Sequence, residues 1–426
     1  MPPDLHAPDA APDASAPPAP GSVTAPLGFR AAAGTCGLKP SGQPDLALIV
    51  ADAPCPAAAV FTRNRVPGAP VTVGRRHLRG GLLKAIVCNA GISNVCTGAA
   101  GIADAEATCK TLAEALTPPL DPPLDPRMVL PSSTGIIGHR LPMDRLLPGV
   151  QALAARLGRG PEIDAAAARA IMTTDLVPKQ ALRRIEIGGR TLTLGAIAKG
   201  SGMIAPNMAT MLSFITTDAT IDRGPLKAAL RHAADRSFNR ISVDHDTSTS
   251  DTVAILASGA AGGAPIVARS GAFDDFCDAL TDLCGELAHM IVRDGEGVTR
   301  LFHVHVRSAS TASEADRIGR TVVGSNLVKT AVHGADPNWG RLAAAIGRSG
   351  VLIQPGKIGI DIAGIAVCRS GEAVDLDGPT LAALETAMKA DEVHFTIHLN
   401  RGASTADWLG CDLSKRYVEI NADYTT

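Results

Sequence analysis

Short apolar runs between prolines and glycines predict buried strands in the first part of the chain. Residues 45–50 (DLALIV), 59–61 and 84–88 (KAIVC) have this pattern. Residues 299–307 and 393–399 differ, because apolar residues alternate there with polar ones, as in a strand with one buried face. We expect a short strand at each of these places.

Helical periodicity separates the predicted strands. It predicts helices over residues 103–115, 163–172 and about 222–236. The clearest amphipathic helix has apolar residues at spacings of three and four on one face, namely Phe276, Leu280, Leu283, Leu287, Met290 and Ile291. Because strands and helices are interleaved to the end of the chain, the pattern predicts an α/β or α+β fold.

A hairpin is predicted at Gly188-Gly189, which joins the alternating runs 185–187 and 190–194. A two-residue type I′ turn needs positive φ at both central positions, and glycine adopts positive φ without steric cost. A further strand-rich run begins at Thr210 (TMLSFITT).

Composition limits the partners of the chain. Its 426 residues, at roughly 150 per domain, predict two or three domains, or one large α/β domain with additions. The 40 basic side chains are balanced by 42 acidic ones, so nucleic acid and anionic membranes are not expected partners. The longest uncharged runs are broken by glycine or proline, which favours buried strands over membrane spans.

Cysteine usage and the N-terminal segment indicate a cytoplasmic protein. The nine cysteines are scattered, with no Cys-x-x-Cys and no zinc-type spacing, so we expect reduced thiols and no metal site. Residues 1–26 contain eight prolines and no Lys or Arg. That composition predicts a flexible tail and no targeting signal.

The common catalytic signatures give no match. The sequence has no Gly-x-Ser-x-Gly, no His-Glu-x-x-His and no Walker A loop. Gly200-Ser-Gly202 loosely fits a dinucleotide fingerprint, but Pro206 lies where the phosphate-binding helix would continue. His303 and His305 share one strand face, which we interpret as a solvated face because no third ligand accompanies them.

The chemistry is concentrated in residues 199–219 (KGSGMIAPNMATMLSFITTDA). A loop rich in Gly, Pro and Asn leads directly into a strand that begins at Thr210, after the small Ala209. A threonine hydroxyl is a weak nucleophile without an adjacent base, and a cut before Thr210 would free an α-amine, with a pKa of about 8, to serve as that base. From these residues alone, self-cleavage and a plain junction between loop and strand both remain open.

The same stretch closely resembles the autoprocessing signature of the ornithine acetyltransferases of arginine biosynthesis (glutamate N-acetyltransferases, the ArgJ family). The resemblance continues from about residue 31 to residue 426, with the family's motifs in the family's order: DLALIVADAPCPAAAVFTRNRVPGAPV, CTGAAGIADAEAT, SSTGIIG, IMTTD, SFNRISVDHDTSTSDT, VRDGEG, LVKTAVHGADPNWGRLAAAIGRSG and INADYTT. It implies an α/β fold, a sandwich of mixed sheets and helices similar to ArgJ and DmpA-like proteins. Two fragments of one precursor, residues 27–209 and 210–426, would form it jointly.

The resemblance also implies a ping-pong acetyl transfer. Acetyl would pass from N2-acetyl-L-ornithine to Thr210 and then to L-glutamate, after cleavage between Ala209 and Thr210. Thr134 and Gly135 match the family's oxyanion-hole pair, which would donate a hydroxyl and a backbone N–H. The family's substrate-binding positions correspond to Thr173, Lys199, Thr210, Glu296, Asn421 and Thr426. Lys199 would pair with the substrate α-carboxylate and Glu296 with an amine.

Several points stay open at this level. A related N-terminal-nucleophile amidase or aminopeptidase would pass the acyl group to water, and a paralogue of specialised metabolism would share the framework. Ala205 and His245 stand where the family usually has His and Gly, which leaves substrate details open. No cofactor is implied. The chain has no compact CoA motif, so acetyl-CoA as a second acetyl donor is open, and the family suggests a heterotetramer of two cleaved pairs.

Overall fold

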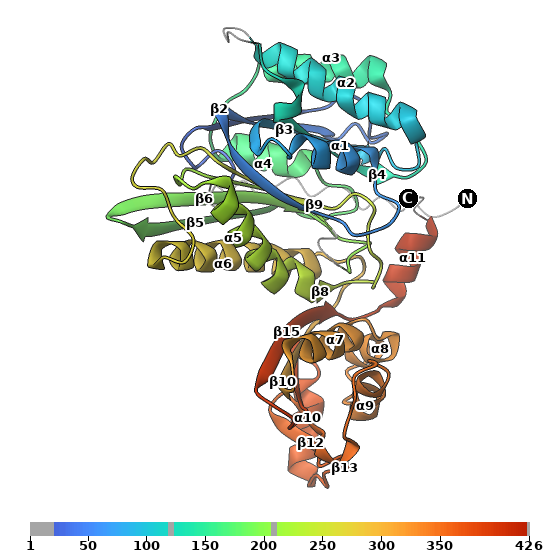
Figure 1. Cartoon of the computed structure of the whole chain (residues 1–426). Helices are drawn as coiled ribbons and strands as arrows, with labels where there is room; N and C mark the ends of the chain where they lie inside the picture. Colours follow the sequence, from blue (N-terminus) through green and yellow to red (C-terminus); the bar gives the residue numbers. More distant parts are fainter. Residues whose placement is uncertain (1–20, 118–122, 206–210, 424–426) are drawn as a thin grey trace, which may run out of the picture.

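The strands of the chain form two mixed sheets (Figure 1) in the computed structural model, which describes residues 21–117, 123–205 and 211–423. The first sheet has eight strands, in the order β4-β3-β2-β9-β7-β6-β5 with β1 paired to β2. Their bounds are β1 (Phe29–Gly34), β2 (Leu46–Phe61), β3 (Leu82–Ile92), β4 (Val129–Ile136), β5 (Lys179–Ile187), β6 (Arg190–Lys199), β7 (Leu212–Thr217) and β9 (Thr252–Ala257).

Strand β2 connects the two halves of this sheet. Its N-terminal part pairs with β3 and its C-terminal part with β9, and the register with β3 shifts between Val50 and Cys55. The sequence predicted separate strands over residues 45–50 and 59–61, and that prediction is wrong. Pro54 lies within the irregular stretch, and proline is tolerated in a strand at such a bulge.

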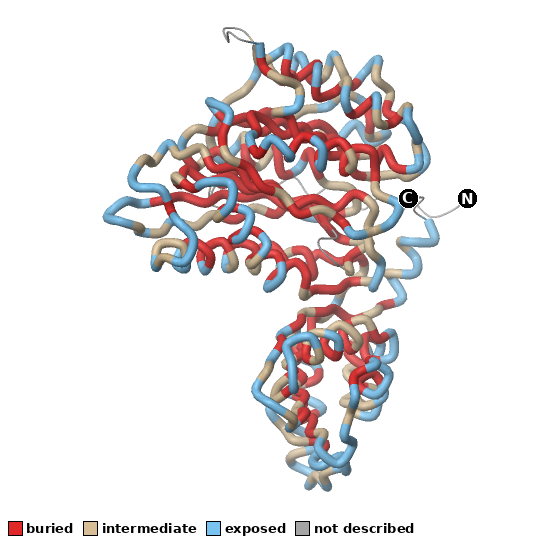
Figure 2. The backbone as a smooth tube through the Cα atoms, viewed as in Figure 1, coloured by how far each residue is buried: buried red, intermediate tan, exposed pale blue. Residues whose placement is uncertain are grey.

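Hydrophobic clusters on both sides of the strands build a sandwich. α2 (Gly98–Leu116) and α3 (Met143–Ala154) cover β1 to β4 from outside. The two halves of the sheet share a central cluster with α4 (Pro161–Ala170), while α5 (Arg223–Arg236) and α6 (Gly271–Arg293) cover the far face of β6, β7 and β9. α1 (Ala69–His77) packs beside β4. This arrangement confirms the predicted α/β sandwich, and Figure 2 shows the buried residues running along the strands.

The second sheet has seven strands in the order β13-β12-β11-β14-β10-β15-β8. They are β8 (Ile241–Ser242), β10 (Leu301–Ala309), β11 (Gly359–Ile362), β12 (Ile365–Arg369), β13 (Glu372–Ala373), β14 (Glu392–His398) and β15 (Ser404–Cys411). Its core packs against α7 (Ala312–Val323), α8 (Asn326–His333), α9 (Trp339–Gly347) and α10 (Gly378–Ala387). After β15 the chain returns toward the first sheet as α11 (Lys415–Asp423) (Figure 1). Short 3-10 turns cover Pro126–Met128, Phe238–Arg240 and Pro355–Lys357.

Most other predicted elements are confirmed. Gly188 and Gly189 have φ of 60° and 72° and join β5 to β6 as a hairpin. The long amphipathic helix is α6, which begins after Ser270, whose hydroxyl accepts the N–H of Phe273 at 3.1 Å. The predicted strands at 84–88, 299–307 and 393–399 lie in β3, β10 and β14, and the predicted helices at 103–115, 163–172 and 222–236 correspond to α2, α4 and α5.

The predicted tail of residues 1–26 is too long. Ser22, Val23 and Thr24 are buried, and the backbone N–H of Thr24 donates to Asp164 at 3.0 Å. Ser22 approaches Gly195 of β6 so closely that a side chain at Gly195 would collide with its carbonyl oxygen. Residues 1–20 lie outside the described part of the chain.

Across residues 21–117, 123–205 and 211–423, no helix combines the length and the apolar composition needed to span a membrane.

Candidate active site

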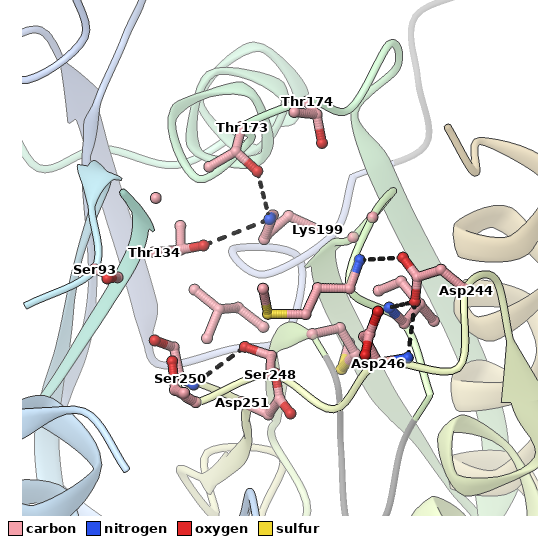
Figure 3. Close-up of a pocket in the computed structure, with 18 of the residues that line it drawn as sticks. Ser93, Thr134, Thr173, Thr174, Lys199, Asp244, Asp246, Ser248, Ser250 and Asp251 are labelled. Carbon is pink, nitrogen blue, oxygen red and sulfur yellow. Dashed lines mark hydrogen bonds between the residues drawn. The ribbon is translucent and has the colours of Figure 1, made fainter. Parts of the chain in front are cut away.

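A cavity of about 250 Å³ opens where β4 and β6 end and where β7 and β9 begin (Figure 3). The loop before β9, the turn after α6 and helix α11 complete its wall. The cavity brings together every predicted site residue that the structure describes: Thr134, Gly135, Thr173, Lys199, Glu296 and Asn421. Ala209, Thr210 and Thr426 lie outside the described residues, but Met211, the next residue after Thr210, lines the cavity.

Lys199, the last residue of β6, points into this cavity and is no surface lysine. Its side chain is only 10% exposed. The ammonium donates to the hydroxyl of Thr173 at 2.6 Å and lies 3.5 Å from that of Thr134, as Figure 3 shows. Residues from three distant parts of the chain therefore meet at one cationic group.

A buried ion-pair network fixes Lys199 from behind. The carboxylate of Asp175 lies 3.8 Å from the Lys199 ammonium and accepts from Lys179 at 2.8 Å. It also accepts the backbone N–H of Thr173 at 2.9 Å and of Gly200 at 2.6 Å. Burial opposes ionisation of Asp175, but the two lysines outweigh it and hold its pKa well below the usual range.

Lys179 also joins this network to the other wall of the cavity. Its ammonium lies 2.6 Å from Asp294, two residues before Glu296. Asp294 has a single lysine partner and lies near Asp175, so burial raises its pKa more than Lys179 lowers it. The backbone on both sides of the cavity is thus tied to one buried ammonium group.

Gly135 can only be glycine in this fold. Its φ is +124°, and a Cβ there would lie 2.2 Å from the carbonyl carbon of Gly91 on the paired strand β3. The missing side chain leaves the Gly135 backbone at the cavity wall beside the Thr134 hydroxyl. A backbone group and a hydroxyl side by side are the donors that an oxyanion hole requires.

Glu296 lines the cavity with a carboxylate, opposite in charge to the Lys199 ammonium. Its carboxylate accepts from the side-chain amide of Asn421 at 2.8 Å, which joins the turn after α6 to the C-terminal helix α11. Gly202 leaves the space that this carboxylate occupies, because a Cβ at that position would lie 2.5 Å from it. Tyr417 of α11 lines the same wall.

Two aspartates of the SVDHDTSTSDT motif were missed as site residues. Asp244 lines the cavity and accepts backbone N–H groups from Met203 and Ile204, and burial raises its pKa to about 6 despite these bonds. Asp251 also lines the cavity, and burial raises its pKa well above the usual range, although Ser248 donates to it and Lys199 is near. The motif itself was the only signal, since their burial follows from tertiary packing.

The cavity thus combines one ammonium with several carboxylates, which suits a ligand that carries both charges. Among the residues that the structure describes, no three His, Cys, Asp or Glu side chains are arranged to hold a metal ion. His303 and His305 lie elsewhere, on one face of β10, where they pair with Glu392 and Asp407 at 2.7 Å each.

The chain is similar to known proteins over nearly its whole length. The model of the ArgJ family matches residues 30–426. The arginine biosynthesis bifunctional protein ArgJ of Symbiobacterium thermophilum is 48% identical over 408 residues, which covers 95% of this chain and 99% of the relative. The protein of the same name from a Synechococcus strain is 45% identical over 414 residues, covering 95% and 98%. A crystal structure of the Bacillus halodurans argJ protein shares 42% identity and a TM-score of 0.48, covering 50% of this chain and 100% of that one.

Proposed function

Because this chain belongs to the ArgJ family of arginine-biosynthesis enzymes, we propose that it transfers the acetyl group of N2-acetyl-L-ornithine to L-glutamate. The products are L-ornithine and N-acetyl-L-glutamate. The observation that carries the proposal is the cavity at the start of β7, in which Lys199 and Glu296 face the same space beside Met211.

The charges of the cavity support both substrates. Acetylornithine and glutamate each carry an α-carboxylate, for which the Lys199 ammonium is a suitable partner. The side-chain ammonium of acetylornithine is complementary to the carboxylate of Glu296, which Asn421 orients at 2.8 Å. Thr173, which already accepts from Lys199, and Thr426 complete the proposed set of substrate ligands.

The proposed reaction has two acyl transfers. The Thr210 hydroxyl attacks the acetyl carbonyl, the amide bond breaks, and ornithine leaves with its amine protonated by the group that accepted the hydroxyl proton. The glutamate amine then attacks the acetyl ester and regenerates the Thr210 hydroxyl. Thr134 and Gly135 are the proposed donors to the oxyanion of both tetrahedral intermediates.

Self-cleavage supplies the base for this chemistry. The Thr210 hydroxyl adds to the carbonyl of Ala209, the amide bond becomes an ester, and water hydrolyses the ester to a carboxylate on Ala209. The freed α-amine of Thr210 then lies on the residue that carries the nucleophile. The mature enzyme is accordingly two fragments, residues 1–209 and 210–426. We propose that two such pairs assemble as a heterotetramer in the cytoplasm.

Cleavage is tested by intact mass under denaturing conditions. We expect two fragments of about half size from the wild type and one full-length, inactive chain from Thr210→Ala. Thr386→Ala, which removes an exposed hydroxyl on α10, is the matched control and should be cut normally. A wild-type chain that stays in one piece yet transfers acetyl groups overturns the self-cleavage part of the proposal.

The acceptor and donor are tested separately. Without glutamate, the ping-pong enzyme should release at most one equivalent of ornithine from acetylornithine, and further release should depend on added glutamate, whereas an amidase or aminopeptidase would turn over with water alone. Formation of N-acetylglutamate from acetyl-CoA in place of acetylornithine decides whether a second acetyl donor is used. Multiple turnovers that are independent of glutamate refute the proposed transferase in favour of the hydrolase.

A further inference from the structure

One segment of the chain, residues 243–252, contacts the backbone on both sides of the proposed cleavage junction. Before the junction, the N–H of Val243 donates to the carbonyl of Ile204 at 2.7 Å. The hydroxyl of Thr247 donates to the carbonyl of Ala205 at 2.9 Å. After the junction, the N–H of Thr252 donates to the carbonyl of Met211 at 3.0 Å. The two ends that flank residues 206–210 are thus fixed relative to each other.

Asp244 of this segment binds two successive backbone N–H groups before the junction. Its two carboxylate oxygens accept the N–H of Met203 at 2.5 Å and the N–H of Ile204 at 2.8 Å, and Figure 3 shows both bonds beside the cavity. One oxygen also accepts from the N–H of Asp246 at 3.1 Å. Met203 has φ of +56°, a left-handed conformation that is unfavourable for a side chain with a Cβ. A charged acceptor that binds two successive N–H groups stabilises that local geometry.

The resting position of residues 203–205 therefore depends on Asp244. Methionine in a left-handed conformation relaxes to a right-handed one if nothing opposes it, and the chain would then leave β6 in another direction. Ile204 also forms an isolated antiparallel bridge with Thr247. Asp244 and Thr247, both in segment 243–252, therefore bind the backbone at the same residue.

We propose that Asp244 is a positioning residue for self-cleavage, because its contacts with Met203 and Ile204 fix the backbone between β6 and the proposed cleavage site. This inference rests on the proposed function, since it concerns the same junction. It assigns Asp244 no contact with substrate. After cleavage, the same contacts keep the end of the first fragment attached to the second.

The ionisation of Asp244 gives the proposal a pH dependence. The titratable groups near Asp244 are acidic: Asp246, Tyr417 and the Cys411 thiol interact with it, and Glu296 is a neighbour of Tyr417. Burial raises the pKa of Asp244 to about 6. The ionised carboxylate accepts both N–H groups, and protonation weakens one of them. The rate of self-cleavage should therefore be highest above pH 6 and should decline as the pH falls through about 6.

The first experiment measures the rate of fragment formation in freshly purified or translated full chain. We expect Asp244→Ala to slow it about 10- to 100-fold, which is the effect of a small displacement of reacting groups. Asp244→Asn should slow it less and should remove the decline near pH 6. Asp275→Asn, which removes an exposed carboxylate on α6, is the control for charge and should leave rate and pH profile unchanged. Normal cleavage of both Asp244 variants, with the pH profile retained, overturns the proposal.

The second experiment does not depend on cleavage. In the Thr210→Ala chain, amide hydrogen exchange should show the N–H groups of Met203 and Ile204 protected, and adding Asp244→Ala should raise exchange of the peptide covering residues 200–205 at least tenfold. Unchanged protection there refutes the positioning role even where cleavage is slow. A wild-type chain that is never cut refutes the proposed function. The exchange of residues 200–205 then still decides whether Asp244 fixes that part of the backbone.

Discussion

Replacing Lys179 with methionine should strongly destabilise the protein. The Lys179 side chain is 0% exposed and lies 2.8 Å from Asp175 and 2.6 Å from Asp294. Methionine has a similar length but no charge, so both carboxylates would lose their shared ammonium in a buried site. Breaking a buried ion pair in this way costs about 3–5 kcal/mol. Two carboxylates lose an ammonium at once, which places this variant toward the upper end, although Asp175 keeps the Lys199 ammonium at 3.8 Å.

A surface lysine gives the matched control. Lys110 pairs with Glu114 at 3.8 Å, but its side chain is 67% exposed. Lys110→Met should change the free energy of unfolding by less than about 0.5 kcal/mol, because solvent screens such pairs. The same chemical substitution is thus expected to differ about tenfold in effect according to burial.

Thermal and urea denaturation measure this difference. At roughly 2–4 °C per kcal/mol, Lys179→Met should lower Tm by about 10 °C, and acetyl transfer should fall because Asp175 also orients Thr173 and Gly200. Adding Asp294→Asn to Lys179→Met should recover part of the stability, since one uncompensated charge is then gone. A Lys179→Met variant within about 1 kcal/mol of wild type would refute the reasoning that these carboxylates stay ionised and depend on Lys179.

Three further predictions concern single positions. Gly135→Ala should lower the free energy of unfolding by about 2–4 kcal/mol and abolish acetyl transfer, because the residue has a positive φ and the new methyl group meets the backbone of β3. Gly138→Ala is the control: it also has a positive φ but lies in open space, so the same denaturation assay should show a loss of only about 1 kcal/mol. Glu392→Gln should remove a part of the stability that depends on acid. Burial opposes ionisation of Glu392, but hydrogen bonds from two histidines and an arginine lower its pKa to about 2. Its contribution to the free energy of unfolding is therefore present above pH 4.5 and disappears as the pH falls toward 2. If the wild type and this variant lose stability in parallel between pH 4.5 and 2, the explanation is wrong. Asn421→Ala should reduce kcat/KM for acetylornithine about tenfold with little change in Tm, because it leaves Glu296 without its amide donor; a change of less than twofold would show that the donor is unimportant.

Local patterns in the sequence predicted the fold well where the signal was local. The Gly188–Gly189 turn and the apolar stripe of α6 both depend on residues within a few positions of each other, and both are confirmed. β2 was divided wrongly, because partners on two different strands keep it extended through its prolines. The packing of Val23 against the central core was missed for the same reason, since that core comes from distant segments.

The candidate site was predictable to a different degree. The resemblance supplied Thr134, Lys199 and Glu296, and the structure brings them to one cavity. Asp175 ends the IMTTD motif of that resemblance but was given no role, because its role depends on contacts with Lys179 and Lys199 that exist only in the folded chain. Charge networks of this kind are set by tertiary distance, and composition or periodicity contains no information on it.

The order of strands in the first sheet has a consequence for the proposed self-cleavage. β7 and β9, which follow Thr210, lie between β2 and β6, which precede it. Two fragments cut before Thr210 would therefore not dissociate by parting at an interface, since separation requires rupture of the sheet itself. Once cut, the enzyme should persist as long as its unfolding barrier allows, and its native mass should not depend on dilution. Refolding, in contrast, becomes a bimolecular reaction between two chains, so heat inactivation that is reversible before the cut should become concentration-dependent after it.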